Sequence, residues 1–321
     1  MTAALPPLRP TDITPDMGMR HLHDAIYGGE VLCWRQSAPV RELIAATRQR
    51  LEAEFGAIEP ELSHAALSHD EQVARYGDIQ RRYSASADIR ALWGKVFTRL
   101  GFDPTQVFHD RLHLRFQLHH DLERAYPRTR FTSTVAFHRD TWGSNCYAQV
   151  NWWAPVWPIT AGRTVAIYPS LWARPLANTT KLFDLAAVLE RARSGGRTAL
   201  AADDMIPHLS EDVGDAPACP VVIEPGDMLV FSGAHAHAGV PNHTRRTRIS
   251  LETRTLWLGD VRAGHSAPNV DGQAKWMSPG WFRRLADGKK LSSVLALDHL
   301  TPYDGHGRLG SANDRTNPAT R

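Results

Sequence analysis

Hydrophobic residues recur at helical spacing in two segments near the start of the chain. Over residues 37–55 the apolar side chains follow one another three or four positions apart, and Gly56 stands where a helix commonly ends. The same spacing returns from near Ser86 or Asp88 up to Gly101. The pattern therefore predicts two amphipathic helices in the N-terminal part of the chain.

From residue 111 onward the hydrophobic period changes from helical spacing to strict alternation. In residues 111–118 the leucines and the phenylalanine share one face, while the arginines, the histidine and the glutamine share the other. Further short strands, separated by turn signals, are expected over residues 132–138, 146–156, 164–168, 220–224, 228–232, 235–240 and 246–257. Short strands of this number and spacing favour a sandwich, a jelly roll or a barrel.

The segments around this predicted β core are less regular. Residues 1–18 are Pro-rich and polar and are expected to form an arm, and a short strand is expected over 28–34. Residues 57–85 show no clear period. A long interruption at about 171–219 contains one predicted helix, over 181–193, and insertions of this kind over a barrel mouth tend to be lids or substrate-binding loops.

These patterns predict one structural domain with three parts. An N-terminal arm and helices over 1–110 are expected to pack on a β core over 111–257, which carries the lid insertion. Residues 258–321 are expected to form a mostly irregular extension, with a short helix near 280–286 and a disordered end over 307–321.

Composition and charge exclude several classes of protein. Lys and Arg exceed Asp and Glu by 37 − 34 = 3 among 321 residues, so bulk charge does not indicate nucleic acid or an acidic membrane as a partner. Cys33, Cys146 and Cys219 are few and scattered, which argues against a disulfide framework and a CxxC metal site. No apolar signal region follows Met1, and no run of apolar residues is long enough to span a membrane. We therefore expect a soluble cytoplasmic protein, and bulk charge does not indicate its substrate.

The strongest candidate for chemistry is a His-x-Asp pair at the end of the strand expected over 132–138. His138 and Asp140 are two positions apart, so both side chains can leave the strand end in the same direction. A third ligand is available about a hundred residues later, where His235, His237 and His243 follow one another. Two histidines and one carboxylate on one face of an ion leave the other positions open, as in non-heme Fe(II) oxygenases.

Two other interpretations compete for this pair. His119 and Asp121 also fit His-x-Asp, but they lead into a charged loop rather than lying between two regular strands. Residues 138–145 also fit the kinase catalytic-loop pattern H-R-D-x-x-x-x-N, yet the glycine-rich loop, the Val-Ala-Ile-Lys strand and the Asp-Phe-Gly motif of kinases are missing from the sequence. For the third ligand, strand parity cannot separate His235 from His237.

Four motifs in order resemble the phytanoyl-CoA dioxygenase-like branch of Fe(II)/2-oxoglutarate oxygenases. Residues 225–232, PGDMLVFS, and then His237 through Asn242 to 248–250, resemble the C-terminal half of that family's core. Residues 137–140 and 162–169 resemble its N-terminal ligand strand and the strand that follows. The resemblance covers about residues 110–257, and the helix at 37–55 corresponds to the family's N-terminal helix.

The resemblance implies a role for individual residues. His138, Asp140 and His237 would be the catalytic iron ligands, and Arg248 would pair with the distal carboxylate of 2-oxoglutarate, assisted by Ser250. The chemistry agrees, because a planar guanidinium matches a carboxylate bidentately, and a ligand set of two imidazoles and one carboxylate leaves positions for the keto acid and O2. The weaker alternative for Arg248 is a surface salt bridge.

Further candidates surround this set. Gln149 and Asn151 share one face of the strand after the ligand pair and could contact 2-oxoglutarate, although satisfied buried amides would give the same pattern. His235 could orient a ligand from behind or be a satisfied buried histidine. Glu252 and Arg254 lie on the Arg248 face of their strand and could pair with each other. The candidates for substrate contact near the expected mouth are Trp142, Trp172, Arg174 and Arg115.

The implied protein is a non-heme Fe(II)/2-oxoglutarate dioxygenase with a mainly β, double-stranded β-helix (jelly-roll, cupin-like) fold and added helices. It would oxidise, in the first instance by hydroxylation, an unactivated C–H bond of a small-molecule substrate, such as a specialised metabolite or an amino-acid derivative. O2 would be consumed, and succinate and CO2 released. The presence of Asp140 agrees with the hydroxylating type, because halogenating members of the wider group lack the carboxylate ligand.

Two further classes of protein stay open. In a cupin-like metal-binding jelly roll without 2-oxoglutarate chemistry, His235, His237 and His243 would form the site and Arg248 would have no role. In a purely structural barrel the histidines would be core polar residues, and no dependence on iron is expected.

Overall fold

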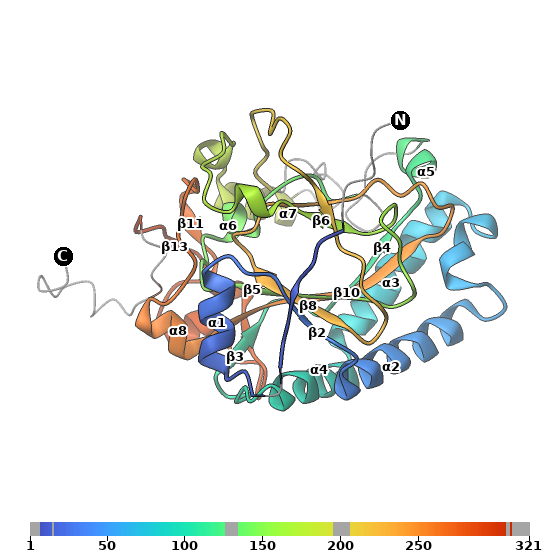
Figure 1. Ribbon diagram of the computed structural model, residues 1–321, viewed down its shortest axis with the longest axis horizontal. Coiled ribbons are helices and arrows are strands. Elements are labelled where there is room, and N and C mark those ends of the chain that lie inside the picture. Colours follow the sequence, from blue (N-terminus) through green and yellow to red (C-terminus); the bar gives the residue numbers. More distant parts are fainter. Residues whose placement is uncertain (1–6, 15, 126–133, 195–205, 306–308, 310–321) are drawn as a thin grey trace, which may run out of the picture.

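The computed structural model describes residues 7–14, 16–125, 134–194, 206–305 and 309 (Figure 1). Its α-helices are α1 (Met19–Tyr27), α2 (Ala38–Phe55), α3 (His69–Ala85), α4 (Ala87–Arg99), α5 (His120–Ala125), α6 (Asp140–Ser144), α7 (Leu185–Ser194), α8 (Leu258–Ala263) and α9 (Leu291–Val294). Its 3-10 helices are η1 (Pro60–Ala65), η2 (Pro169–Leu171), η3 (Thr180–Leu182) and η6 (Pro279–Trp281). Its strands are β1 (Thr11–Asp12), β2 (Leu32–Trp34), β3 (Val107–His109), β4 (His113–Gln117), β5 (Val150–Pro155), β6 (Val165–Ile167), β7 (Cys219–Pro220), β8 (Met228–Ser232), β9 (His237–Gly239), β10 (Arg248–Trp257), β11 (Trp276–Met277), β12 (Arg283–Arg284) and β13 (Thr301–Pro302).

Strand β10 organises a mixed eight-stranded sheet. The strand order is β1-β2-β8-β5-β10-β3-β12, and β4 also pairs with β10. Along one edge of β10, β4 pairs with its first half and β3 with its end, while β5 pairs along the opposite edge. All of these pairs are antiparallel, and β1 with β2 is the one parallel pair described. Because β10 is ten residues long, it presents a row of alternate side chains to each face of the sheet.

A smaller sheet carries the opposite wall of the site. It has the order β7-β6-β9, and both of its described pairs are antiparallel. Strand β9 begins at His237, and an isolated bridge joins this residue to His138. One cavity is lined by residues of the large-sheet strands β4, β5, β8 and β10 and of the small-sheet strands β6 and β9. The two sheets therefore enclose the cavity between them.

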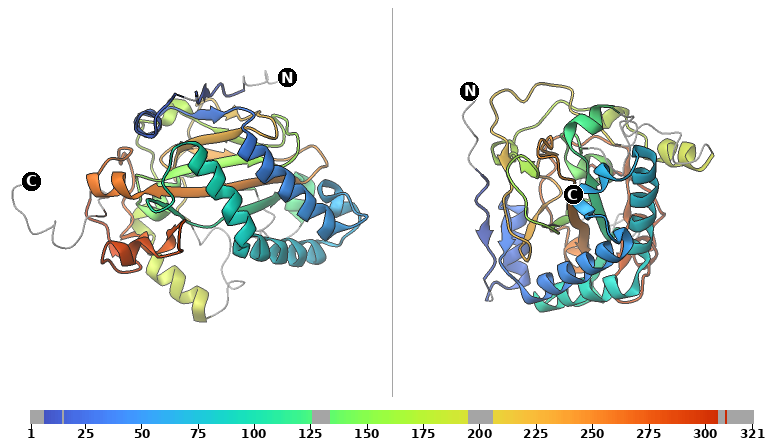
Figure 2. Two further views of the ribbon diagram at one scale, coloured as in Figure 1. Left: turned by 90° about the horizontal axis from the view of Figure 1, so that it is seen from below. Right: turned by 90° about the vertical axis from the view of Figure 1, so that its right-hand side faces the viewer.

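Helices cover the other face of the large sheet. The predicted helices at 37–55 and from 86–88 to 100 are confirmed as α2 and α4, which lie side by side across the strands (Figure 2). The ring of Phe97 meets Trp152 of β5 edge to face, with centroids 5.1 Å apart. Helix α3 is tied to β4 directly, because the Gln80 amide donates to the Leu114 carbonyl at 3.1 Å. Apolar burial and these backbone contacts fix the sheet that holds the site.

Several predicted elements differ from the structure. Helices α1 and α3 were not predicted, and the unassigned residues 57–85 fold as η1 and α3. The strands expected over 220–224 and 235–240 are limited to β7 and β9. The helix expected near 280–286 is a 3-10 turn followed by β12. The helix predicted over 181–193 is α7, which begins at Leu185.

The segment that contains the predicted ligands His138 and Asp140 also differs from its predicted structure. A strand over 132–138 is not present in its described part, residues 134–138, where only the bridge at His138 occurs. Residues 132 and 133 lie outside the described residues. Asp140 opens the short helix α6 instead of ending a strand. The expected disorder at 307–321 falls outside the described residues, except for Leu309, which is buried.

At the level of fold class, the prediction of a sheet core with added helices is confirmed. The strands do not close into a barrel within the described part of the chain, so the jelly roll stays a proposal. The division into 1–110, 111–257 and 258–321 likewise stays a prediction. Among the described residues, no helix is long and apolar enough to cross a membrane.

Candidate metal centre and anion pocket

His138, Asp140 and His237 converge between the two sheets. One ligand atom from each of the three side chains lies within 4.8 Å of the others, and this is the one such group of three or more found in the described part of the chain. The backbone explains the convergence, because His138 and His237 exchange two N–H···O hydrogen bonds of 3.0 Å across their bridge. The Nε2 atoms lie 3.7 Å (His138) and 3.8 Å (His237) from oxygens of Asp140.

Both imidazoles are oriented by backbone carbonyls. The Nδ1 atom of His138 lies 2.9 Å from the Ala136 oxygen, and Nδ1 of His237 lies 2.9 Å from the His235 oxygen. An Nδ1–H that donates to each carbonyl leaves the two Nε2 lone pairs directed at the space beside Asp140. The rings therefore have the tautomer and the direction that a metal ion requires.

Burial and neighbouring charges shift the pKa values of His237 and Asp140. Burial lowers the pKa of His237 to about 4, and the neighbouring His138 acts in the same direction. Burial opposes the ionisation of Asp140, but the Arg254 guanidinium and the two imidazoles outweigh it and hold the pKa of this carboxyl well below its ordinary range. Near neutral pH the site thus offers a neutral imidazole at His237 and a carboxylate, which are the forms that bind a divalent cation.

Asp140 is held by two further side chains. Its Oδ1 atom accepts from Nη1 of Arg254 at 3.0 Å, and its Oδ2 atom accepts from the Asn151 amide. Asn151 in turn accepts from Nε2 of Gln149 at 3.1 Å. Arg254 also contacts Asp110 at 2.6 Å, so its charge is shared between two carboxylates. Asn151 therefore contacts the proposed ligand Asp140 directly, and Gln149 contacts it through Asn151.

Arg248, in contrast to Arg254, has no carboxylate within ion-pair distance among the described residues. Its side chain comes from β10, is 1% exposed and lines the cavity beside the three proposed ligands. Neither Nε nor Nη1 has a hydrogen-bond partner among the described residues, and the same is true of the Ser250 hydroxyl two positions along the strand. Burial lowers the pKa of Arg248 to about 9, with the nearby Arg115 adding to the shift. The cavity is thus lined by a buried cation with two nitrogens that have no hydrogen-bond partner among the described residues.

The cavity is small and mixed in character. Its volume of about 90 Å³ has room for several water molecules, since one water needs about 10 to 15 Å³ by this measure. Val165 and Phe231 supply apolar walls, and the ring of Trp153 lies 6.0 Å from the Arg248 guanidinium carbon. A small organic anion with an apolar middle would match these walls and this charge.

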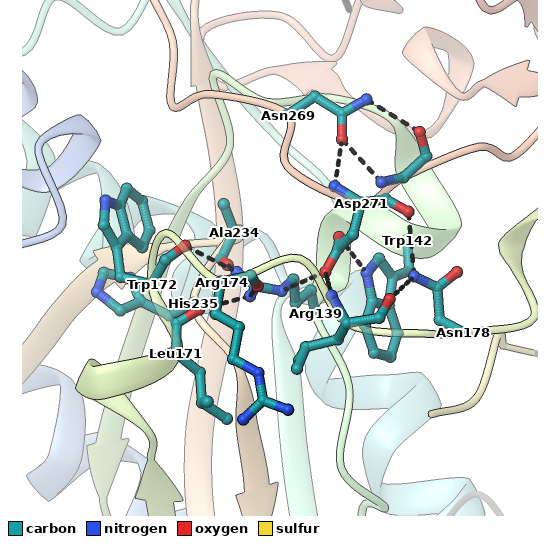
Figure 3. A network of polar contacts seen from close by, with 12 residues as sticks. Arg139, Trp142, Leu171, Trp172, Arg174, Asn178, Ala234, His235, Asn269 and Asp271 are labelled. Atoms are coloured by element: carbon teal, nitrogen blue, oxygen red, sulfur yellow. Dashed lines mark hydrogen bonds and ion pairs between the residues drawn. The ribbon is translucent and has the colours of Figure 1, made fainter. Parts of the chain in front are cut away.

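The four residues predicted to contact substrate lie in different places in the structure. Arg115 lines the cavity and forms an ion pair with Glu252. Trp142 is fully buried and its indole donates to Asp271 at 2.7 Å (Figure 3). Trp172 stacks against His235 with centroids 4.4 Å apart, and Arg174 is 45% exposed and faces Glu211. Of these four candidates, only Arg115 reaches the cavity.

The competing histidines have other partners. His235 is fully buried, its Nε2 lies 3.0 Å from the Gly29 carbonyl oxygen, and burial lowers its pKa to about 4. His243 packs against the ring of His120, and His119 packs against His64. Neither the cluster of His235, His237 and His243 nor the pair of His119 and Asp121 forms a three-residue metal site among the described residues.

Sequence reasoning missed two carboxylates near the site and paired a third with the wrong arginine. Asp110 precedes β4 and was not singled out, although its carboxylate holds Arg254. The suggested pairing of Glu252 with Arg254 is replaced by ion pairs of Glu252 with Arg115 and of Arg254 with Asp110 and Asp140. Asp271, far along the C-terminal extension, reaches the segment of the ligands through Arg139. The alternation of β10 pointed to Glu252 and Arg254, whereas no pattern along the chain pointed to Asp110 or Asp271.

Comparisons with known proteins give distant likenesses. No family model and no curated protein matches the chain. Among solved structures, the chain is similar to EvdO2 from Micromonospora carbonacea var. aurantiaca complexed with 2-oxoglutarate (TM-score 0.41, 14% identity, 74% of this chain and 90% of that one). It is also similar to SnoN, a non-heme alpha ketoglutarate dependent epimerase from nogalamycin biosynthesis (0.36, 11%, 74% and 84%), and to apo ThoJ, a non-heme monooxygenase (0.35, 16%, 68% and 70%). At these values the likenesses are too distant to assign a function, so the assignment rests on the chain's own residues.

Proposed function

We propose that this protein is an Fe(II)- and 2-oxoglutarate-dependent oxygenase that acts on a small molecule, with His138, Asp140 and His237 as the metal ligands. Two neutral imidazoles and one carboxylate, with positions left open on one side, are the donor set of such iron sites. When bound together with 2-oxoglutarate and O2, Fe(II) supplies oxidation of a C–H bond coupled to decarboxylation of the keto acid to succinate. The two facing sheets support a jelly-roll fold for this site.

The observation that carries the proposal is the buried, unpaired guanidinium of Arg248. A charge taken out of water without a partner is strongly unfavourable, so a buried arginine with two nitrogens that lack hydrogen-bond partners supports an anion in the functional state. A carboxylate accepts two parallel bonds from one guanidinium, and the Ser250 hydroxyl can donate a third. In this proposal Arg248 and Ser250 bind the distal carboxylate of 2-oxoglutarate, while its other end lies toward Asp140.

The charge balance of the pocket supports the same pair of ligands. Among the described residues that line the cavity or pair with its lining, three arginines and three carboxylates give 3 − 3 = 0: Arg115, Arg248, Arg254, Asp110, Asp140 and Glu252. A divalent cation and a keto acid with two carboxylates cancel each other, so both together leave the site neutral. Either one alone leaves a buried net charge.

The remaining residues have supporting roles in this proposal. Arg254 and Asn151 hold Asp140 in one orientation, and Gln149 holds Asn151. The apolar walls exclude water from the reacting region, which strengthens every charge interaction inside it. Arg115, already paired with Glu252, is the residue that we assign to a polar group of the substrate. Hydroxylation is the simplest outcome that these residues support.

The decisive experiment is an anaerobic titration of the metal-free protein with Fe(II) and then with 2-oxoglutarate, following the visible charge-transfer band of a metal-bound keto acid. We expect the band only when both are present. In Arg248→Ala, Fe(II) affinity is expected to stay within about threefold, while the Kd of 2-oxoglutarate rises roughly 100-fold, because charge-assisted bonds contribute about 1.5 to 3 kcal/mol each.

The matched control is Arg174→Ala, which removes a half-exposed arginine outside the cavity and is expected to change neither affinity. A parent protein that binds Fe(II) but never shows the band would replace this proposal by a metal-binding protein without keto-acid chemistry. Equal loss of both ligands in Arg248→Ala would point to misfolding or to a different anchor.

A further inference from the structure

Arg139 lies between the proposed ligands His138 and Asp140, but its side chain turns away from the cavity. It is 2% exposed, and Figure 3 shows its guanidinium surrounded by backbone carbonyls. The Nη2 atom donates to the Leu171 oxygen at 2.7 Å and to the Arg174 oxygen at 3.0 Å, and Nη1 donates to the carbonyls of Trp172 and Ala234. One side chain therefore ties the ligand segment to residues 171–174 and to the turn that precedes His237.

The charge of Arg139 is met by a carboxylate from the C-terminal extension. Nε of Arg139 lies 3.2 Å from Oδ2 of Asp271, whose side chain is 5% exposed. The same carboxylate accepts from the Trp142 indole in α6 at 2.7 Å and from the Leu176 backbone N–H at 3.2 Å. Asp271 thus contacts two of the segments that Arg139 connects, α6 through Trp142 and residues 171–178 through Leu176.

A turn in the extension holds Asp271 in place. The Asn269 side-chain oxygen accepts from the backbone N–H groups of Asp271 at 3.1 Å and of Gly272 at 2.8 Å. The Asp271 carbonyl in turn accepts from the Asn178 amide at 3.0 Å. Three segments distant in sequence, residues 139–142, 171–178 and 269–272, therefore meet at one buried ion pair (Figure 3).

Burial makes each partner dependent on the other. The side chains of Arg139 and Asp271 are 1% and 5% exposed, so both charges lose hydration on folding. Breaking a buried pair by removing one partner leaves an uncompensated charge and is strongly unfavourable. Without Asp271, the Arg139 side chain would have to move toward water. Because His138 and Asp140 are its neighbours in the chain, such a movement would displace both proposed ligands.

We propose that Asp271 is a positioning residue for the metal centre: through Arg139, the C-terminal extension holds the Asp140 ligand and residues 171–178 in a fixed relation. The metal-binding part of this inference rests on the function proposed above. The mechanical part, that one carboxylate fixes residues 171–178, does not depend on any metal.

The test compares two buried carboxylates of the same extension. Asp271→Asn keeps the size of the side chain but removes its charge, and Asp260→Asn does the same at a fully buried residue of α8 that contacts His23, Tyr27 and His265 instead of the site. Both variants are expected to lower the thermal midpoint. Only Asp271→Asn should weaken Co(II) binding, at least about tenfold, as expected for loss of a residue that orients a ligand.

Hydrogen exchange of the metal-free protein, read by mass spectrometry on peptides covering 171–178, gives the second readout. We expect Asp271→Asn to speed exchange of this segment at least about tenfold and Asp260→Asn to leave it within about twofold of the parent. If Asp271→Asn does not fold, Asn269→Ala is used, since it loosens the exposed turn and should shift exchange in the same direction by less.

The outcomes separate the two proposals. Unchanged exchange in 171–178 in the Asp271 and Asn269 variants would overturn the positioning role, whatever the metal does. A parent protein that binds no Co(II), with exchange faster only in Asp271→Asn, would leave the mechanical role in place and reject the metal centre. Equal effects of Asp260→Asn and Asp271→Asn on both readouts would reduce Asp271 to a general stabilising residue.

Discussion

Asp140 is the residue around which the charges of the site are arranged. Its carboxylate is held by Arg254 and Asn151, and Arg254 is itself held by Asp110. Partners of this kind fix the orientation of a metal ligand, and their loss commonly weakens metal binding by about 10- to 100-fold. The carboxylate is therefore ionised and oriented by the protein itself.

The ion pair of Glu252 with Arg115, which lies beside the same cavity, can be tested by the pH dependence of stability. Burial opposes the ionisation of Glu252, but Arg115 outweighs burial and lowers the pKa from 4.5 to about 2. A carboxyl whose pKa is lower in the folded state adds stability above its ordinary pKa, and this stability is lost as the pH falls toward 2. From these values, the parent should lose about 2 kcal/mol more than Glu252→Gln between pH 6 and pH 3.

Urea unfolding followed by tryptophan fluorescence at pH 6, 4 and 3 measures this difference. The other buried carboxylates titrate in both proteins, so the difference between the two curves isolates Glu252. Parallel pH profiles for the parent and the variant would show that the Arg115 ion pair does not hold Glu252 ionised.

At the scale of residues, the sequence could indicate only those site residues that are related to one another by a short spacing or by alternation along one strand. His138 and Asp140 are two positions apart, and the alternation of β10 indicated that Arg248, Ser250 and Glu252 share one face. Asp110 could not be found in this way, because it lies 144 residues from Arg254, and no pattern along the chain relates the two. Trp142 was assigned to the substrate because a cluster of tryptophans in the sequence does not show which of the side chains face a cavity and which are buried in the core.

At the scale of elements, helices were predictable where the apolar row was unbroken. Helix α2 buries an uninterrupted row of mainly apolar residues, whereas the buried face of α3 includes Gln72, Gly77 and Gln80. These polar positions are satisfied within the fold, as when Gln80 donates to the backbone of β4. A helix that buries amides against a sheet edge loses the hydrophobic period by which sequence analysis finds helices.

The ligand segment shows a second limit of local patterns. Residues 134–138 were predicted as a strand, but their backbone pairs with β9 only at His138 and through one hydrogen bond of 2.8 Å from Gly239 to Val135. Gly239 permits this close approach, since a Cβ there would lie 2.7 Å from a methyl of Thr134 and 3.1 Å from the Val135 nitrogen. The distance between the two histidines thus depends on a residue that carries no side chain.

Gly239→Ala should therefore impair the proposed metal centre without changing a proposed ligand. The added methyl is expected to push residues 134–138 off β9, to cost about 1 to 3 kcal/mol of stability and to weaken Co(II) binding at least about tenfold. The control is Gly94→Ala in α4, where a Cβ meets nothing within 4 Å. This variant should gain about 0.4 to 1 kcal/mol and bind Co(II) like the parent.

Isothermal titration with Co(II) and urea unfolding of both variants give the two quantities. Normal Co(II) affinity in a destabilised Gly239→Ala protein would mean that the ligand segment can shift without moving His138.

At the scale of the whole molecule, the site lies between two sheets that also pack against each other through one apolar cluster, with Trp153 and Phe231 from the large sheet and Ile167 from the small one. Arg248 belongs to the large sheet and His237 to the small one, and residues of both sheets line the same cavity. The helices on the outer face hold the large sheet, while the extension reaches the opposite side through Asp271. A ligand that contacts both Arg248 and the metal centre therefore links parts of the fold that unfolding must separate.

This arrangement predicts a coupled thermal stabilisation by metal and keto acid. A ligand at 100 times its Kd that binds only the folded state adds about 2.7 kcal/mol, which raises the midpoint by roughly 5 °C for a chain of this size. With Co(II) present and O2 excluded, we expect 2-oxoglutarate to give this shift in differential scanning fluorimetry. With EDTA instead of the metal the shift should fall to roughly 1 °C, because the keto acid then keeps only its contact with Arg248 and brings uncompensated charge into the pocket.

Pyruvate is the matched ligand, since it has the keto-acid end but lacks the distal carboxylate that Arg248 would bind. It should stabilise the metal-loaded protein less than 2-oxoglutarate at the same concentration, and Arg248→Ala should respond equally to the two acids. Equal shifts by both acids in the parent would remove Arg248 as the anchor. A full shift by 2-oxoglutarate in EDTA would show that the anion binds without the metal, and the two sheets would then be joined by Arg248 and its carboxylate alone.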